Sequence, residues 1–334
     1  MNKAILATGL LAALAAVPAQ GAAPYPPSTA IIGLTWDTST YQYGGLGADI
    51  WPITWASDGS LRAAYGDGQI NCPAKVSYGV VAITSEAPGT AMQGVHCGPT
   101  GHGKGKIMAL GAAGSSLFAV VAPQGTASGF PIMRSTDDGR SWATGWSPSW
   151  MAESFINFGR GNAGAPDGHV YMVDGGATTV KLVRFPADRW ADSSAYQYFS
   201  GSATAPAWSS KRGASKAVFT DAAGVQQPTL QYVPGLDRYL LIAAHTGPGK
   251  IGVFESEKMW GPWRTVHYTE NWLGLGTRGK YYSIYFPLKW QSSDGRTLWA
   301  TFSCHNARES GACGQYHDRF NLIRVTLALG GAKP

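Results

Sequence analysis

The sequence has little charge, and its apolar runs are short. Only 14% of the residues are charged, and the basic ones are scattered rather than gathered in blocks, which argues against a nucleic-acid-binding surface. The apolar run near the start, residues 4–17, is shorter than the ~20 residues that span a bilayer. No segment has the period of a long amphipathic helix. The sequence therefore disfavours nucleic-acid-binding, membrane-spanning and helical proteins.

The first 22 residues predict export. They combine a lysine near the start, an apolar run and small residues at the end, which is the pattern of a secretory signal peptide. Cleavage is expected after Ala19 or Ala22. No cysteine lies at this junction, so a lipid anchor is not expected. We predict a soluble monomer that is periplasmic or secreted after cleavage.

Four cysteines form an even set, which in an exported chain predicts disulfides. Their proximity in sequence favours the pairs Cys72–Cys97 and Cys304–Cys313. The alternative is a metal site made by Cys304, Cys313 and the histidines beside them, although this spacing matches no standard zinc pattern.

Glycine and aromatic residues are abundant, which suits many short strands joined by tight turns. Five times along the chain, an apolar stretch is followed by a Gly or Asp turn and further apolar stretches. The turns lie at residues 58–59, 114, 167–168, 235–237 and 294–295. Radial stacking of five such small sheets would bury their faces. We therefore predict that residues 23–330 form one all-β domain, a five-bladed β-propeller. Six or seven blades are the alternative if residues 190–225 hide another unit.

The first strand of each blade lines the axis of a propeller, so functional side chains are expected where these strands begin. Among only 20 Asp and Glu residues, Asp49 opens the first inner strand and Glu153 opens the third. Asp67 closes the next strand of the first blade. Carboxylates that converge on an aromatic cleft can cleave glycosidic bonds, one as acid and the other as base or nucleophile. We expect Asp49 to be the base or nucleophile, Glu153 the acid, and Asp67 a residue that positions them.

A second group of residues suggests different chemistry. A cation that neutralises a uronate, together with His or Tyr for proton transfer, would suit a polysaccharide lyase. The predicted substrate-binding residues are His102, Lys106, Asn157, Arg160, Tyr285 and, as a stacking surface for sugar, Trp51. No cofactor is expected, and an axial structural cation such as calcium is left open.

Residues 135–142, STDDGRSW, resemble the Asp-box of sialidases. The motif occurs once and no arginine triad accompanies it, which argues against sialidase activity. Asp137 and Gly139 are instead expected to form an outer turn of the second blade, closed by Ser135 and packed by Trp142.

Several phrases together resemble a family of exported bacterial propeller proteins of formerly unknown function. They are SFINFGRGNAGAPDGHVYM, LDRYLLIA, FESEKMWGPWRTV and FPLKWQSSDGRTLWATFS, in this order. The resemblance implies a relation to carbohydrate-active enzymes, including endo-acting D-arabinan hydrolases, and the five-bladed propeller of furanoside-cleaving hydrolases. GADIW and YGDG resemble the family's acidic motifs of the first blade, which implies roles for Asp49 and Asp67.

The function predicted is therefore a glycoside hydrolase that acts on a polysaccharide or oligosaccharide, furanoside- or arabinan-like, by carboxylate acid/base catalysis. The alternatives are a polysaccharide lyase that acts on a uronate-containing glycan by β-elimination, and a propeller that binds glycans without catalysis.

Overall fold

The structure is a computed structural model that describes residues 22–101, 103–123, 128–245, 250–274, 280–305 and 313–331. Residues 1–21 of the predicted signal peptide and the predicted site residue His102 lie outside these ranges. Within them, no helix is long and apolar enough to cross a membrane.

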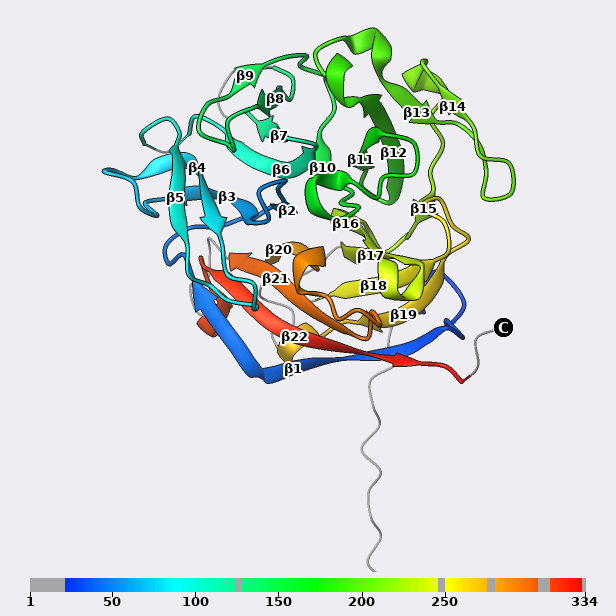
Figure 1. The fold of residues 1–334 in the computed structure, drawn as a ribbon. Helices are drawn as coiled ribbons and strands as arrows, with labels where there is room; N and C mark the ends of the chain where they lie inside the picture. Colours follow the sequence, from blue (N-terminus) through cyan, green and yellow to red (C-terminus); the bar gives the residue numbers. More distant parts are fainter. Residues whose placement is uncertain are drawn as a thin grey trace, which may run out of the picture.

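Five antiparallel sheets surround a common axis, which confirms the five-bladed β-propeller (Figure 1). Blade 1 contains β2 (Ile53–Trp55), β3 (Leu61–Gly68), β4 (Val76–Ile83) and β5 (Gln93–Cys97). Blade 2 contains β6 (Lys106–Ala113), β7 (Ser116–Ala122), β8 (Ile132–Ser135) and β9 (Ala143–Thr144). Blade 4 contains β16 (Gln226–Val233), β17 (Arg238–Ala244), β18 (Ile251–Ser256) and β19 (Arg264–Thr269).

Blade 3 is larger than the others because it absorbs the segment that could have formed a sixth blade. It contains β10 (Ala152–Phe155), β11 (His169–Gly175), β12 (Thr179–Pro186), β13 (Gln197–Phe199), β14 (Trp208–Ser209) and β15 (Phe219–Thr220). The strands β13, β14 and β15 pair with this sheet, and β15 returns to pair with β12. Residues 190–225 therefore extend blade 3 rather than adding a blade.

Blade 5 joins the two ends of the chain. It contains β20 (Lys280–Tyr285), β21 (Thr297–His305), β22 (Phe320–Leu329) and β1 (Ile31–Gly44). The outermost strand β1 pairs with β22 along almost its whole length, from Ile31 opposite Leu329 to Gly44 opposite Phe320. The first strand of the described chain thus closes the ring.

Short 3-10 helices connect several strands. They are η1 (Arg160–Asn162), η2 (Ala187–Arg189), η3 (Ser193–Ala195), η4 (Arg212–Ala214), η5 (Pro234–Leu236), η6 (Trp272–Gly274), η7 (Leu288–Trp290) and η8 (Gly314–Tyr316).

The core lies between neighbouring blades. Each sheet presents apolar side chains to the sheets on both sides, as in the edge-to-face contact between Phe118 of blade 2 and Phe185 of blade 3, whose ring centroids are 5.5 Å apart. Phe302 of blade 5 and Val253 of blade 4 share another fully buried cluster. Because both faces of each sheet are buried against neighbouring blades, polar side chains meet around the inner strands.

The innermost strands β2, β6, β10, β16 and β20 surround the axis and are joined by polar side chains (Figure 1). Ser154 Oγ of β10 donates a hydrogen bond to the carbonyl of Pro228 in β16, at 2.9 Å. Thr229 Oγ1 of β16 donates to the carbonyl of Ile284 in β20, at 2.5 Å. These bonds fix the inner strands relative to one another, and so fix the side chains at their ends.

The STDDGRSW segment forms the turn between β8 and β9, as predicted. Asp137 Oδ1 accepts hydrogen bonds from Ser135 Oγ at 2.7 Å and from the Ser141 amide at 2.9 Å. Gly139 has a φ of 91°, and its carbonyl accepts the Trp142 indole N–H at 3.0 Å. Asp137 therefore serves the turn and not a reaction.

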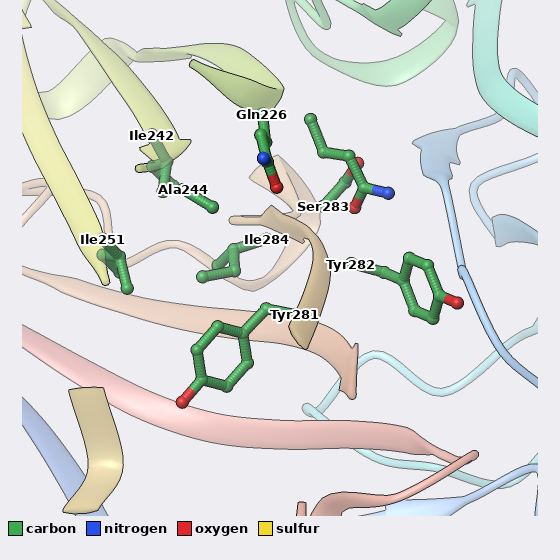
Figure 2. A pocket seen from close by; sticks show the side chains of 9 residues that line it. Gln226, Ile242, Ala244, Ile251, Tyr281, Tyr282, Ser283 and Ile284 are labelled. Carbon is green, nitrogen blue, oxygen red and sulfur yellow. The ribbon is translucent and has the colours of Figure 1, made fainter. Parts of the chain in front are cut away.

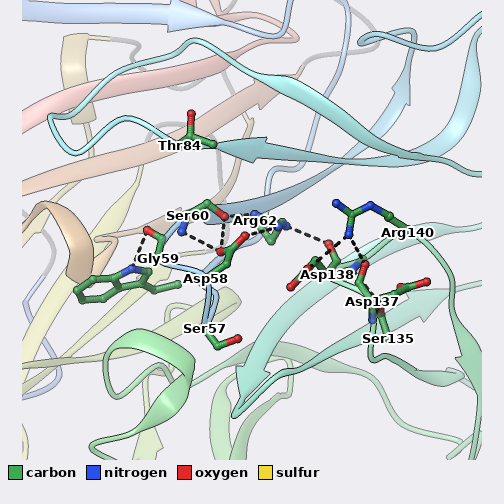
Figure 3. A network of polar contacts seen from close by, with 12 residues as sticks. Ser57, Asp58, Gly59, Ser60, Arg62, Thr84, Ser135, Asp137, Asp138 and Arg140 are labelled. Carbon is green, nitrogen blue, oxygen red and sulfur yellow. Dashed lines mark hydrogen bonds and ion pairs between the residues drawn. The ribbon is translucent and has the colours of Figure 1, made fainter.

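This turn also joins blade 2 to blade 1, as Figure 3 shows. Arg62 of β3 donates through Nε to the carbonyl of Asp138 at 3.0 Å, and through Nη2 to Asp58 at 2.7 Å. Ser60 completes the network by donating to Asp58 from its amide and its hydroxyl. The side chain of Arg62 is only 4% exposed, so this network holds the first two blades together.

Candidate active site where the inner strands begin

The direction of the inner strands defines two ends of the propeller axis. Asp49 lies just before β2, and its carboxylate meets Lys106, the first residue of β6. At the other end Arg160, which follows β10, donates a hydrogen bond to the carbonyl of Ser57, which follows β2. The starts of these strands therefore meet at one end of the axis, and the residues that follow them meet at the other.

Asp49 is held in place by an isolated bridge to β3. Its amide donates to the carbonyl of Gly66 at 3.0 Å, and the Gly66 amide donates back at 2.8 Å. A Cβ at position 66 would lie 2.5 Å from Asp49 Oδ1, so only glycine leaves room for this carboxylate. Asp49 is 7% exposed as a result.

Lys106 joins two of the predicted catalytic carboxylates. Its Nζ lies 3.0 Å from Asp49 Oδ1 and 2.9 Å from Oδ2, and 2.7 Å from Asp67 Oδ2. Because both carboxylates contact one nitrogen, their nearest oxygens lie no more than about 6 Å apart, close enough for both to reach one glycosidic bond. The structure thus brings Asp49, Asp67 and Lys106 together, and Lys106 acts as their counter-ion.

Burial and neighbouring charges adjust the acidity of this group. Burial raises the pKa of Asp49 above its ordinary 3.8, and the Asp318 and Asp67 charges add to this effect, although Lys106 opposes it. Burial would lower the pKa of Lys106, but the two carboxylates outweigh burial and raise it. Lys106 is therefore a permanent cation, and Asp49 is a carboxyl group that holds its proton to higher pH than usual.

Two further residues, Asp318 and Tyr282, also interact with this group. Asp318, which was not among the candidate site residues, lies just before β22, and its charge acts on both Asp49 and Tyr282 of β20. Burial and then the Asp49 charge raise the pKa of the Tyr282 hydroxyl. Figure 2 shows that Tyr282 and Tyr281 extend to opposite sides of β20, as alternate residues of a strand do. We call the three carboxylates Asp49, Asp67 and Asp318, together with their counter-ion Lys106, the carboxylate cluster.

Glu153 lies near the start of β10, the inner strand of blade 3, and so at the same end of the axis. A Cβ at Gly175 would come within 2.8 Å of Glu153 Cγ, so this glycine makes room for the side chain. Burial raises the pKa of Tyr285, and the Glu153 charge adds to this effect. Pairing of Glu153 with Asp49 stays a prediction.

The other predicted substrate-binding residues lie elsewhere. Asn157 donates to Thr54 Oγ1 at 2.9 Å, and Arg160 contacts Ser57, so both lie towards the opposite end of the inner strands from the carboxylate cluster. Arg160 there lines an open pocket of about 540 Å³.

Trp51 and Tyr285 are core residues, which corrects their prediction as exposed contacts for sugar. Trp51 is 0% exposed, and its ring packs against Tyr65 and Phe320 with centroids 5.4 Å away in each case. The backbone of Trp51 has a φ of 82°, which turns this segment so that the indole points into the core. Tyr285 is 3% exposed. Neither ring can stack on a sugar without rearrangement.

Both predicted disulfides are present, and both lie at the end of the propeller that holds the carboxylate cluster. Cys72–Cys97 closes the segment that follows Asp67, and Cys304–Cys313 closes the segment that precedes Asp318. The alternative metal site is therefore excluded for these cysteines. Among the residues described here, no group of three or more His, Cys, Asp or Glu side chains is placed to hold a metal ion.

A small cavity lies beside the cluster, between β16 and β20 (Figure 2). Gln226, Ser283 and Tyr282 contribute to its wall. Its volume of about 10 Å³ is enough for one water molecule and far too small for a sugar ring. This cavity is therefore no sugar subsite.

Comparison with known proteins assigns the chain to a family and shows which solved structures share its fold. A family model described as a domain of unknown function, DUF4185, matches residues 125–317. This is more than half of the chain, and the protein belongs to that family. No curated protein matches the sequence.

Similar solved structures share the architecture at low sequence identity. A Bacteroides ovatus protein named only as a hydrolase has a TM-score of 0.57 and 13% identity, over 85% of this chain and 87% of that one. A GH43_1 enzyme from Xanthomonas citri, also solved with xylose, has a TM-score of 0.50 and 12% identity, over 87% and 91%. The β-xylosidase RS223 has a TM-score of 0.51 and 11% identity, over 86% and 95%. At these identities the similarity establishes the fold.

Proposed function

We propose that the protein is an exported glycoside hydrolase whose reacting carboxylates are Asp49 and Asp67. The observation that carries this proposal is their meeting on one ammonium group, that of Lys106, where the inner strands begin. Glycoside hydrolysis needs two carboxyl groups in different protonation states on either side of one bond. The two groups differ in burial, since the side chain of Asp49 is 9% exposed and that of Asp67 is 26% exposed.

The difference in burial suggests a division of roles. Asp49, whose pKa burial raises, is suited to hold a proton and give it to the leaving oxygen. Asp67 has the more exposed carboxylate and lies 2.7 Å from Lys106, which suits a base or nucleophile. This order reverses the role expected for Asp49 from the sequence. Glu153 remains the second candidate for the acid, because it lies at the same end of the axis.

The fold supports a carbohydrate substrate without naming it. The similar Xanthomonas citri enzyme was solved with xylose, and RS223 is a β-xylosidase. The resemblance seen in the sequence favours a furanoside such as arabinan. Two disulfides are typical of proteins in oxidising compartments, which agrees with export to the periplasm or the medium.

The test is incubation of the purified protein with arabinans, xylans and uronate-containing polysaccharides. New reducing ends and the absorbance of unsaturated uronates are recorded together. Reducing ends without that absorbance support hydrolysis, and both signals together support the lyase alternative. Binding by calorimetry without either signal supports the non-catalytic alternative and would overturn the proposal.

The pH dependence of the reaction follows from the position of Asp49. If Asp49 is the acid, kcat/KM falls as pH rises through its pKa, because the proton needed by the leaving group is lost. Burial raises this pKa above 3.8, so the falling limb lies above that value, and we expect highest activity on the acid side of neutrality. The measurement is kcat/KM from pH 3 to 9 at constant ionic strength. A rate that rises steadily through neutrality would rule out Asp49 as the acid.

A further inference from the structure

The segment that precedes β22 is fastened to β21 by a disulfide and by the main chain. Cys304, in β21, is bonded to Cys313, and it forms a parallel bridge with His317. The amide of Asp318 donates a hydrogen bond to the carbonyl of Cys304 at 2.9 Å. Both cysteines are fully buried, so the segment is held from inside the blade.

The same segment holds the chain that leads to Asp49. The carbonyl of Asp318 accepts hydrogen bonds from the amides of Gly47 at 2.8 Å and Ala48 at 3.2 Å. Asp318 has a φ of 42°, a left-handed conformation that aspartate tolerates better than most residues. Asp318 therefore fixes the residue that immediately precedes Asp49, across the junction between blades 5 and 1.

The carboxylate of Asp318 is one of the charged groups that act on Asp49. Among the described residues, the charged or titratable groups that face Asp49 are Lys106 of β6, Asp67 of β3, Tyr282 of β20 and Asp318. His317 accompanies them, with Nδ1 3.6 Å from Asp318 Oδ2. Asp49 and Asp67 thus share one lysine, and the Asp318 charge adds a third carboxylate to the surroundings of Asp49. Such an excess of negative charge favours a proton on the most buried of the three, which is Asp49.

We propose that Asp318 is a positioning residue of the active site, which acts through Asp49 and depends on the Cys304–Cys313 disulfide for its place. This inference rests on the proposed hydrolase function. Asp318 holds the main chain before Asp49 by its carbonyl, and its carboxylate helps to keep the Asp49 proton in place.

The test compares Asp318→Asn with Asp294→Asn. Asp294 is a matched control because it lies in an exposed turn of the same blade, bonded to Ser292. Loss of the Asp318 charge should lower the pKa of Asp49 and move the falling limb of kcat/KM to lower pH by about 0.5–1 unit. The control Asp294→Asn should leave the falling limb of kcat/KM at its wild-type pH. Asp318→Glu should restore the wild-type position of this limb in part.

The pKa of Asp49 is measured independently by NMR titration of carboxyl-labelled protein. An unchanged Asp49 pKa in folded Asp318→Asn overturns the inference, whatever the activity. If the wild-type protein cleaves no glycan but the Asp49 pKa falls in the variant, then the hydrolase function fails and the electrostatic link stands. The two failures are therefore distinguishable.

The disulfide is tested with the double variant Cys304→Ala/Cys313→Ala, kept at a temperature where circular dichroism shows it folded. We expect the falling limb of its kcat/KM profile to move to lower pH, as in Asp318→Asn, because the disulfide no longer holds the segment that precedes β22. A folded double variant with the wild-type pH profile would remove the disulfide from the proposal.

Discussion

Replacing Asp49 by asparagine is expected to lower kcat/KM on the substrate glycan by about 10²–10⁴-fold, the usual contribution of a general acid or base. Asparagine keeps the size of the side chain but can neither give nor accept the proton. The loss should appear in kcat more than in KM, because the proton moves only in the transition state. Steady-state kinetics on the glycan identified by the substrate panel measures it.

The control for this variant is again Asp294→Asn, which should keep wild-type kinetics. Asp49→Asn should also keep its fold, because an amide can still accept a hydrogen bond from Lys106. Circular dichroism and thermal unfolding check this point. Full activity in folded Asp49→Asn would contradict the assignment and shift attention to Glu153.

Replacing Lys106 by methionine is expected to destabilise the protein by about 3 kcal/mol at neutral pH. Methionine is similar in length but uncharged, so Asp49 and Asp67 would face each other without their shared counter-ion. Removal of one partner of a buried ion pair typically costs about 3–5 kcal/mol, and Lys106 is not completely buried, with 15% of its side chain exposed. Urea unfolding of wild type and variant measures the difference in free energy.

The pH dependence of this variant gives a second check. Without Lys106 the pKa of Asp49 rises further, so protonation at acid pH should relieve the repulsion and shrink the deficit in stability. In the double variant Asp49→Asn/Lys106→Met the deficit should be smaller than the sum of the two single effects. A deficit that is constant from pH 4 to 8 would mean that lost packing, and not lost charge, is responsible.

The architecture was accessible from the sequence because tight turns have a local signature. The turns at Asp58–Gly59 and Asp294–Gly295 have φ values of 92° and 69° at their glycines, a conformation that this residue adopts without strain. The sequence pattern could not show that the strand at residues 31–44 belongs to blade 5. Residues 31–44 pair with a strand almost 300 residues away, and no local feature encodes such a contact.

The site was partly accessible for the same reason. Asp49 was found because it opens an inner strand, and Asp67 because it ends the neighbouring strand. Asp318 was missed because its segment resembles any polar loop, and its proximity to Asp49 arises only when blades 5 and 1 meet. Trp51 was misjudged because its place beside Asp49 says nothing about the left-handed backbone that turns its ring inward.

The pairing of β1 with β22 also has a consequence for the order of events during biosynthesis. The strand that is made early has no partner until the final strand of blade 5 has been synthesised. Blades 1 to 4 are built from strands that are neighbours in sequence and can form as the chain grows, whereas blade 5 requires a contact between distant segments. We therefore expect ring closure to be a slow, late step of folding, before which β1 is an unpaired edge open to aggregation or to a chaperone.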